Sequence, residues 1–189
     1  MHRDPWIALA GLGDRNDGGF ARVGEPAEDR VRAARLDEAL EILAGLWSGR
    51  PFSLDGEHFQ VREATFLPRP VQEPRIPIWI GGQWPRRGPT ERAARWDGFV
   101  GHKVHGPDEP WLLTPDDVRE LRAFAGPRRR DPSIPFDVAL TAGAYDDEGE
   151  RREAIAALDE AGATWWVEYV PPGDVDEMRR EIAAGPRPA

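Results

Sequence analysis

A short apolar run at residues 76–80 ends in two consecutive glycines, Gly81 and Gly82, and a pair of arginines follows. The run predicts a strand that is buried on both faces. Because glycine has no Cβ, the turn that we expect after this strand lets backbone N–H groups approach a ligand closely. A helix expected to begin at Thr90 adds the positive end of its dipole. The pattern predicts binding of a phosphate-bearing cofactor, although an ordinary turn with solvated arginines fits the same spacing.

Two histidines three residues apart could bind one metal ion, and His102 and His105 flank Lys103 in this way. Gly101 and Gly106 lie on either side of this pair, and the segment follows an expected strand, so it does not predict the helical turn that would bring both imidazoles onto one ion. We therefore expect loop histidines and no metal site. A histidine at the carboxyl end of a strand could still face the active site of a barrel. We assign no catalytic acid or base.

Other chemically interesting residues have simpler interpretations. Trp165 and Trp166 could stack on an aromatic ligand, but we favour core packing in a strand. Glu168, on the same expected strand, would need a partner if it were buried. The acid-rich segments at 146–148 and 174–177 lie at expected helix starts, where carboxylates offset the helix dipole.

Composition excludes several classes of function. The chain has 189 residues, of which 40% are hydrophobic and 31% are charged, as expected for one globular domain spanning residues 1–189. Its formal charge of −9 argues against non-specific binding of nucleic acid. No apolar run approaches the roughly 18 residues of a membrane-spanning helix. The chain has no cysteine and no signal-peptide pattern, so we expect a cytoplasmic protein without disulfides.

Strand and helix patterns alternate along the chain. Strands are expected at residues 7–10, 76–80, 97–101, 136–141 and 164–169, and helices at 26–48, from 90, from 114, at 150–161 and at 174–184. An Asp55-Gly56 turn predicts a hairpin insertion at residues 50–62. This α/β alternation predicts about five parallel strands with covering helices. A complete open sheet and part of a (β/α)₈ barrel, which needs eight strands, both fit this count.

Several segments resemble the luciferase-like monooxygenase family, in the same order and spread over most of residues 7–186. They are Arg35-Leu36-Asp37-Glu38-Ala39-Leu40-Glu41-Ile42-Leu43, Leu46-Trp47-Ser48-Gly49, Pro68-Arg69-Pro70-Val71-Gln72, Ile76-Pro77-Ile78-Trp79-Ile80-Gly81-Gly82 and Arg92-Ala93-Ala94-Arg95-Trp96-Asp97-Gly98. The resemblance implies a partial (β/α)₈ TIM barrel that lacks the family's N-terminal strands, roughly three of eight. It also implies reduced FMN or the deazaflavin coenzyme F-420 as the cofactor.

The resemblance assigns the cofactor-binding residues. Gly81 and Gly82 match the turn that lies against the cofactor phosphate, and Lys103 resembles a position that can hold a phosphate charge. A solvated loop lysine fits Lys103 equally well. Gln83, placed with these residues in the site, begins a Gln-Trp-Pro stretch that departs from the shorter Gly-Pro continuation of many deazaflavin enzymes, so the choice between the two cofactors stays open.

Two functions are compatible with these observations. One is a flavin- or deazaflavin-dependent oxidoreductase or monooxygenase that acts on a small organic substrate by hydride transfer or oxygen activation. The other is a non-catalytic, truncated remnant or an assembly partner of such an enzyme. Because open sheet edges invite pairing, we also expect a homodimer.

Overall fold

The computed structural model describes residues 26, 28–104, 111–141, 147–167 and 173–185. The expected first strand at residues 7–10 lies outside this part of the chain. The chain divides into two compact units, one ending at Ile78 and the other beginning at Trp79. None of the described helices is both long and apolar enough to cross a membrane.

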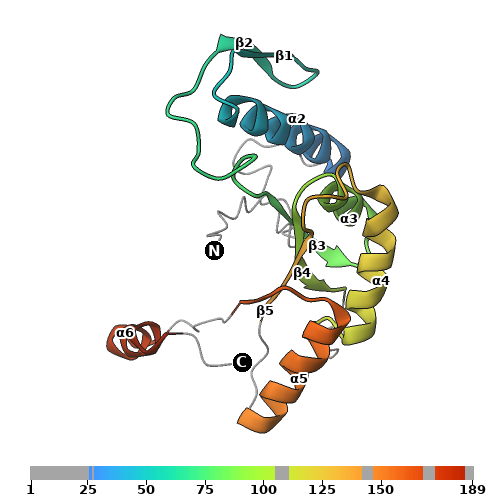
Figure 1. The fold of residues 1–189 in the computed structure, drawn as a ribbon, viewed down its shortest axis with the longest axis vertical. Helices are drawn as coiled ribbons and strands as arrows, with labels where there is room; N and C mark the ends of the chain where they lie inside the picture. Colours follow the sequence, from blue (N-terminus) through green and yellow to red (C-terminus); the bar gives the residue numbers. More distant parts are fainter. Residues whose placement is uncertain (1–25, 27, 105–110, 142–146, 168–172, 186–189) are drawn as a thin grey trace. The chain divides into compact units, whose positions relative to one another are not determined.

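The first unit consists of one helix and one hairpin. Helix α2 (Asp29–Trp47) is followed by β1 (Phe52–Asp55) and β2 (Gln60–Ala64), which pair antiparallel (Figure 1). The helix packs against β1 where Gly45 faces the ring of Phe52, because a Cβ at Gly45 would overlap that ring. Leu40 is the buried residue of the helix.

Glu38 of α2 joins the helix to the loop of the hairpin. Its carboxylate accepts backbone N–H bonds from Glu57 (2.8 Å), His58 (3.0 Å) and Phe59 (2.8 Å). Burial raises the pKa of Glu38, but these hydrogen bonds outweigh that effect and hold the pKa below its ordinary value. A Cβ at Gly56 would overlap the carboxylate, so glycine at this position lets Glu38 approach the loop closely. The sequence places Glu38 on the polar face of the helix and gives no sign of this contact.

Replacing Glu38 by glutamine is expected to loosen the loop and to remove a pH-dependent part of the unit's stability. The pKa is lower in the folded chain, so the stabilisation is present above the ordinary glutamate pKa and is lost as the pH falls through the lowered folded value. The amide NMR shifts of residues 57–59, followed from about pH 7 to about pH 3, report the protonation of the Glu38 carboxylate that these amides contact. The matched control is Glu63→Gln, an exposed glutamate of β2. Identical titrations in the wild type and in Glu38→Gln would contradict the assignment.

The second unit is built on a parallel sheet of four strands. The strands are β3 (Trp79–Trp84), β4 (Gly98–Lys103), β5 (Asp137–Thr141) and β6 (Trp165–Val167), in this order across the sheet. The helices of this unit are α3 (Arg87–Ala94), α4 (Pro115–Ala125), α5 (Glu148–Ala161) and α6 (Val175–Ala184), and the 3₁₀ turn η1 (Gly126–Arg128) follows α4. Helices α3, α4 and α5 follow one another along the same side of the sheet (Figure 1). The expected α/β class with a parallel sheet is therefore confirmed.

The core of this unit lies between the sheet and its helices. Ile80, Phe99 and Val138 from three neighbouring strands are fully buried, as are Val118 and Leu121 from α4. These residues belong to the strands expected at 76–80, 97–101 and 136–141 and to the helix expected from 114. Their burial excludes water from one face of the sheet and fixes the positions at which the strands end.

Strand β3 continues four residues beyond the point predicted from sequence. Gly81 and Gly82 lie inside the strand, and pairing with β4 continues to Trp84 opposite Lys103. Gly82 is needed there for packing, because a Cβ would come within 2.5 Å of Pro89 and 3.0 Å of Phe99. The turn expected at the glycines instead follows Trp84.

Two boundaries next to the expected site also differ from the prediction. Helix α3 begins at Arg87 rather than Thr90, whose hydroxyl donates to the carbonyl of Arg86 from within the helix (3.1 Å). Strand β4 includes His102 and Lys103, which were expected in the loop after it.

Candidate functional site

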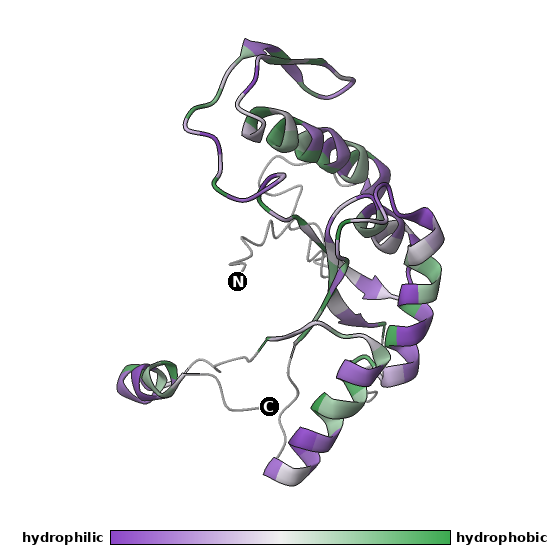
Figure 2. Ribbon diagram, in the orientation of Figure 1, coloured by the Kyte–Doolittle hydropathy of each residue, from purple (hydrophilic) through white to green (hydrophobic). Residues whose placement is uncertain are grey.

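Polar side chains gather where β3 and β4 end. Gln83 lies opposite His102 in the parallel register, and Trp84 lies opposite Lys103. The hydropathy colouring turns hydrophilic toward the ends of both strands (Figure 2), where Gln83 of β3 and His102 and Lys103 of β4 are partly buried. Ligands of α/β proteins bind at the carboxyl ends of parallel strands. This edge of the sheet is therefore the candidate site.

The backbone N–H and C=O groups of Gly81 and Gly82 point to opposite edges of strand β3. The carbonyl of Trp84 accepts a hydrogen bond from the N–H of Val104, just beyond β4 (2.6 Å). Alternate residues of a strand direct their backbone groups to the same side, so Gly82 also faces β4. A Cβ at Gly101 would overlap the carbonyl oxygen of Gly82, in agreement with this orientation.

Gly81 and Gln83 then direct their backbone groups to the other side of β3. In the described part of the chain no further strand pairs with that side. The carbonyl of Gln83 accepts a hydrogen bond from the N–H of Arg86 (2.8 Å), which closes the turn after β3. Of the two glycines predicted to bind phosphate, Gly81 alone has its amide directed away from the sheet partner β4.

Gln83 and His102 form a polar pair across the strand ends. Nε2 of Gln83 lies 3.0 Å from Nε2 of His102. Because the amide nitrogen of Gln83 can only donate, Nε2 of His102 is the acceptor in this contact. The His102 ring also meets the ring of Trp111 edge-on, with 6.3 Å between centroids. His105, the other histidine considered for a shared metal ion, lies outside the described residues.

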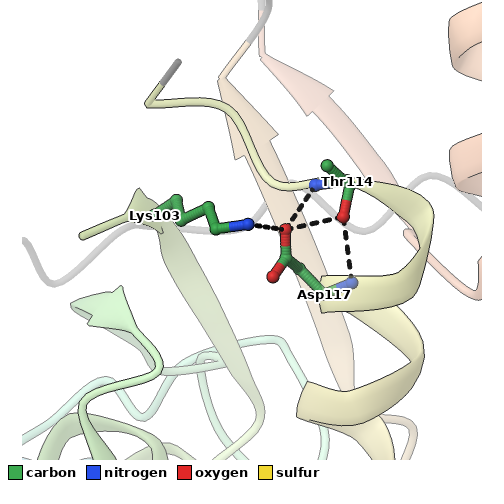
Figure 3. Close-up of polar contacts among 3 residues, drawn as sticks. All are labelled: Lys103, Thr114 and Asp117. Carbon is green, nitrogen blue, oxygen red and sulfur yellow. Dashed lines mark hydrogen bonds and ion pairs between the residues drawn. The ribbon is translucent and has the colours of Figure 1, made fainter. Parts of the chain in front are cut away.

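Lys103 ends β4 and forms an ion pair with Asp117 of helix α4. Its Nζ lies 3.0 Å from Oδ2 of Asp117 (Figure 3). The Lys103 side chain is 38% exposed, whereas that of Asp117 is 12% exposed. Lys103 is also the only lysine of the chain, whose other 24 basic residues are arginines. The site thus offers one partly exposed ammonium group that is held by a more buried carboxylate.

The start of α4 fixes that carboxylate. Oδ2 of Asp117 accepts hydrogen bonds from the backbone N–H (2.9 Å) and the hydroxyl (2.6 Å) of Thr114, and the Asp117 N–H donates back to the Thr114 hydroxyl (3.2 Å). Burial raises the pKa of Asp117, but the hydrogen bonds from Thr114 and Lys103 outweigh it and hold the pKa below its ordinary value. The sequence predicts this cap from Thr114, Pro115 and the acidic residues that follow. It does not predict that Asp117 also binds Lys103.

The tryptophan pair lies in β6, and Trp165 is at the amino end of that strand, at the edge of the sheet opposite to the candidate site. Trp165 packs on Trp79, with 5.4 Å between ring centroids, and the Trp79 indole N–H donates to Oδ2 of Asp137 (3.1 Å). All three residues begin their strands. Trp165 therefore packs against Trp79 at the amino ends of the strands, where it is partly buried. Glu168 lies outside the described residues.

Comparisons with known proteins agree with this architecture. A family model described as luciferase-like monooxygenase matches residues 11–185. The solved coenzyme F420-dependent tetrahydromethanopterin reductase of Methanopyrus kandleri matches 88% of this chain and 69% of its own, with a TM-score of 0.57 and 14% identity. At this identity the match shows the fold alone, a partial TIM barrel whose sheet is not closed in the described residues.

The curated relatives include one uncharacterized protein and two enzymes that are named for different reactions. An uncharacterized protein of Mycobacterium tuberculosis is 29% identical over 80% of this chain and 49% of its own length. The FMNH(2)-dependent dimethylsulfone monooxygenase of Pseudomonas putida is 29% identical over 75% of this chain and 37% of its own. The F420-dependent glucose-6-phosphate dehydrogenase of Kineococcus radiotolerans is 33% identical over 55% of this chain and 30% of its own. The chain thus spans about half the length of these relatives or less.

Proposed function

The chain belongs to the luciferase-like monooxygenase family, and we propose on this basis that it is a flavin- or deazaflavin-dependent oxidoreductase or monooxygenase. Relatives named for FMNH2 and for F420 support both cofactors. The observation that carries the proposal is the family match together with the polar strand ends of β3 and β4. We further propose that residues 1–189 form one domain of this family, with a hairpin insertion at 50–62, and that the substrate is a small organic molecule.

The residues at the strand ends fit the phosphate of either cofactor. Lys103 supplies an ammonium group that is partly open to solvent. Gln83 supplies a carboxamide at the end of the neighbouring strand, on the face of the sheet opposite to the Lys103 side chain, because successive side chains alternate between the faces. The backbone of Gly81, a buried residue of β3, is directed away from β4. The role proposed for Gly82 is to let β3 pack closely on Pro89 and Phe99. When bound, the cofactor supplies hydride transfer or oxygen activation, while the protein binds the phosphate and orients the ring.

Titration of the purified chain with FMN and, separately, with coenzyme F-420 tests the proposal. Quenching of cofactor fluorescence and the absorbance spectrum report binding without requiring turnover. We expect saturable binding of one of the two. The absence of binding to both, in a chain with a cooperative thermal transition, would contradict the proposal.

The alternative is a non-catalytic assembly partner, and one observation favours it. The parallel sheet of the described residues is open, with β3 and β6 at its two edges. Open edges favour pairing with another chain, so we propose a homodimer in either case. Light scattering coupled to size-exclusion chromatography measures this directly. A monodisperse monomer over a range of concentrations would contradict the dimer and weaken the alternative.

A further inference from the structure

Lys103 is not a free cation, because Asp117 already neutralises it. The ammonium group and the Thr114 cap contact the same oxygen of Asp117, Oδ2. A phosphate that approaches Lys103 therefore meets a fixed negative charge beside the ammonium. We propose that Asp117 is a positioning residue that holds Lys103 at the end of β4 and lowers the affinity of this strand end for anions. The proposal rests on the anion site assigned above to Lys103.

The two partners differ in how firmly they are held. Asp117 lies in the first turn of α4 and is bound through its side chain and its backbone to Thr114. Lys103 is more exposed, and its long side chain can rotate away from the carboxylate. An incoming anion therefore draws Lys103 toward itself while Asp117 stays in place. The affinity of the end of β4 for an anion then depends on how strongly the Asp117 carboxylate binds the Lys103 ammonium group.

Among the described residues, Lys103 is the cation that contacts the Asp117 carboxylate. Asp116, the adjacent carboxylate, is exposed and pairs with Arg119 on the same helix (2.6 Å). His102 has a polar contact with Gln83 of β3. Because its pKa is held low, Asp117 stays ionised at neutral pH, so the competition persists there. Coulomb repulsion between the carboxylate and a phosphate dianion a few ångströms away is strong enough to change affinity severalfold.

The variant Asp117→Asn tests this inference, because asparagine keeps the shape of the side chain and an oxygen that can accept from Thr114. We expect it to bind inorganic phosphate and FMN about tenfold more tightly than the wild type. Asp116→Asn is the matched control and is expected to bind as the wild type does. Thermal melting of each variant checks that the fold is retained.

The single lysine provides a direct readout. Labelling lysine with ¹³C at the ε-carbon gives one lysine signal, which belongs to Lys103. We expect this signal to shift on addition of phosphate, at lower concentrations in Asp117→Asn than in the wild type. Unchanged or weaker phosphate binding in folded Asp117→Asn would overturn the inference. Tighter phosphate binding without binding of FMN or coenzyme F-420 would uphold it and contradict the proposed function instead.

Discussion

Gly101→Ala is expected to destabilise the second unit by more than about 3 kcal/mol, or to prevent its folding. A Cβ at this position would overlap the carbonyl oxygen of Gly82 on the adjacent strand, and it would lie 3.0 Å from the ring of Phe99. The obstacle is backbone paired in a buried sheet, so no side-chain rotation can relieve it. Urea denaturation followed by circular dichroism measures the loss.

Gly173→Ala is the matched control for this prediction. A Cβ at Gly173, an exposed residue before α6, would meet nothing within 4 Å. Alanine there is expected to change the free energy of unfolding by no more than about 0.5 kcal/mol. Wild-type stability in Gly101→Ala would mean that β3 and β4 do not pair in the register that aligns Gly82 with Gly101.

Lys103→Ala is expected to weaken binding of FMN or coenzyme F-420, whichever the chain takes, by at least about tenfold. The change removes the ammonium group that fits the phosphate and leaves the carboxylate of Asp117, which repels it. Cofactor fluorescence measures the dissociation constant. Arg119→Ala is the control, because it removes one positive charge from an exposed position that pairs with Asp116. If both variants lost the same amount of cofactor affinity, Lys103 would act only through the net charge of the chain and not by binding the phosphate.

The alternation of strands and helices could be read from the sequence because local patterns determine it. The Thr114 cap and Pro115 set the start of α4, and Gly162, at φ +102°, ends α5. In each case the signal lies within a few residues of the boundary that it marks. The buried stripe of α4, with Val118 and Leu121, follows from helical spacing in the same way.

The sequence predicts a turn at Gly81 and Gly82, whereas the structure has them inside β3. A local pattern cannot distinguish a glycine that forms a turn from a glycine that allows close packing within a strand. Consecutive glycines after an apolar run usually mark a turn. Here Gly82 accommodates Pro89, which follows seven residues later, and Phe99 from the next strand. Only the packing of separate elements shows that a small residue is required at Gly82, so the sequence pattern predicts a strand that is shorter than β3.

The candidate site was predicted in part. Gln83 and Lys103 lie at the ends of adjacent strands, where a ligand site was expected. The partners of the site could not be predicted, because Asp117 comes from the helix after β4 and His102 was assigned to a loop. Contacts between separate elements depend on how those elements pack, and spacing within one segment contains no such information. Glu38 illustrates the same point in the first unit.

The most direct test of the central claim compares FMN with riboflavin, which has the same ring system but no phosphate, in the wild type and in Lys103→Ala. If Lys103 holds the phosphate, the wild type binds FMN at least about tenfold more tightly than riboflavin, and Lys103→Ala removes most of that difference. The same preference for FMN in both proteins would contradict the account, because the phosphate would then be bound elsewhere.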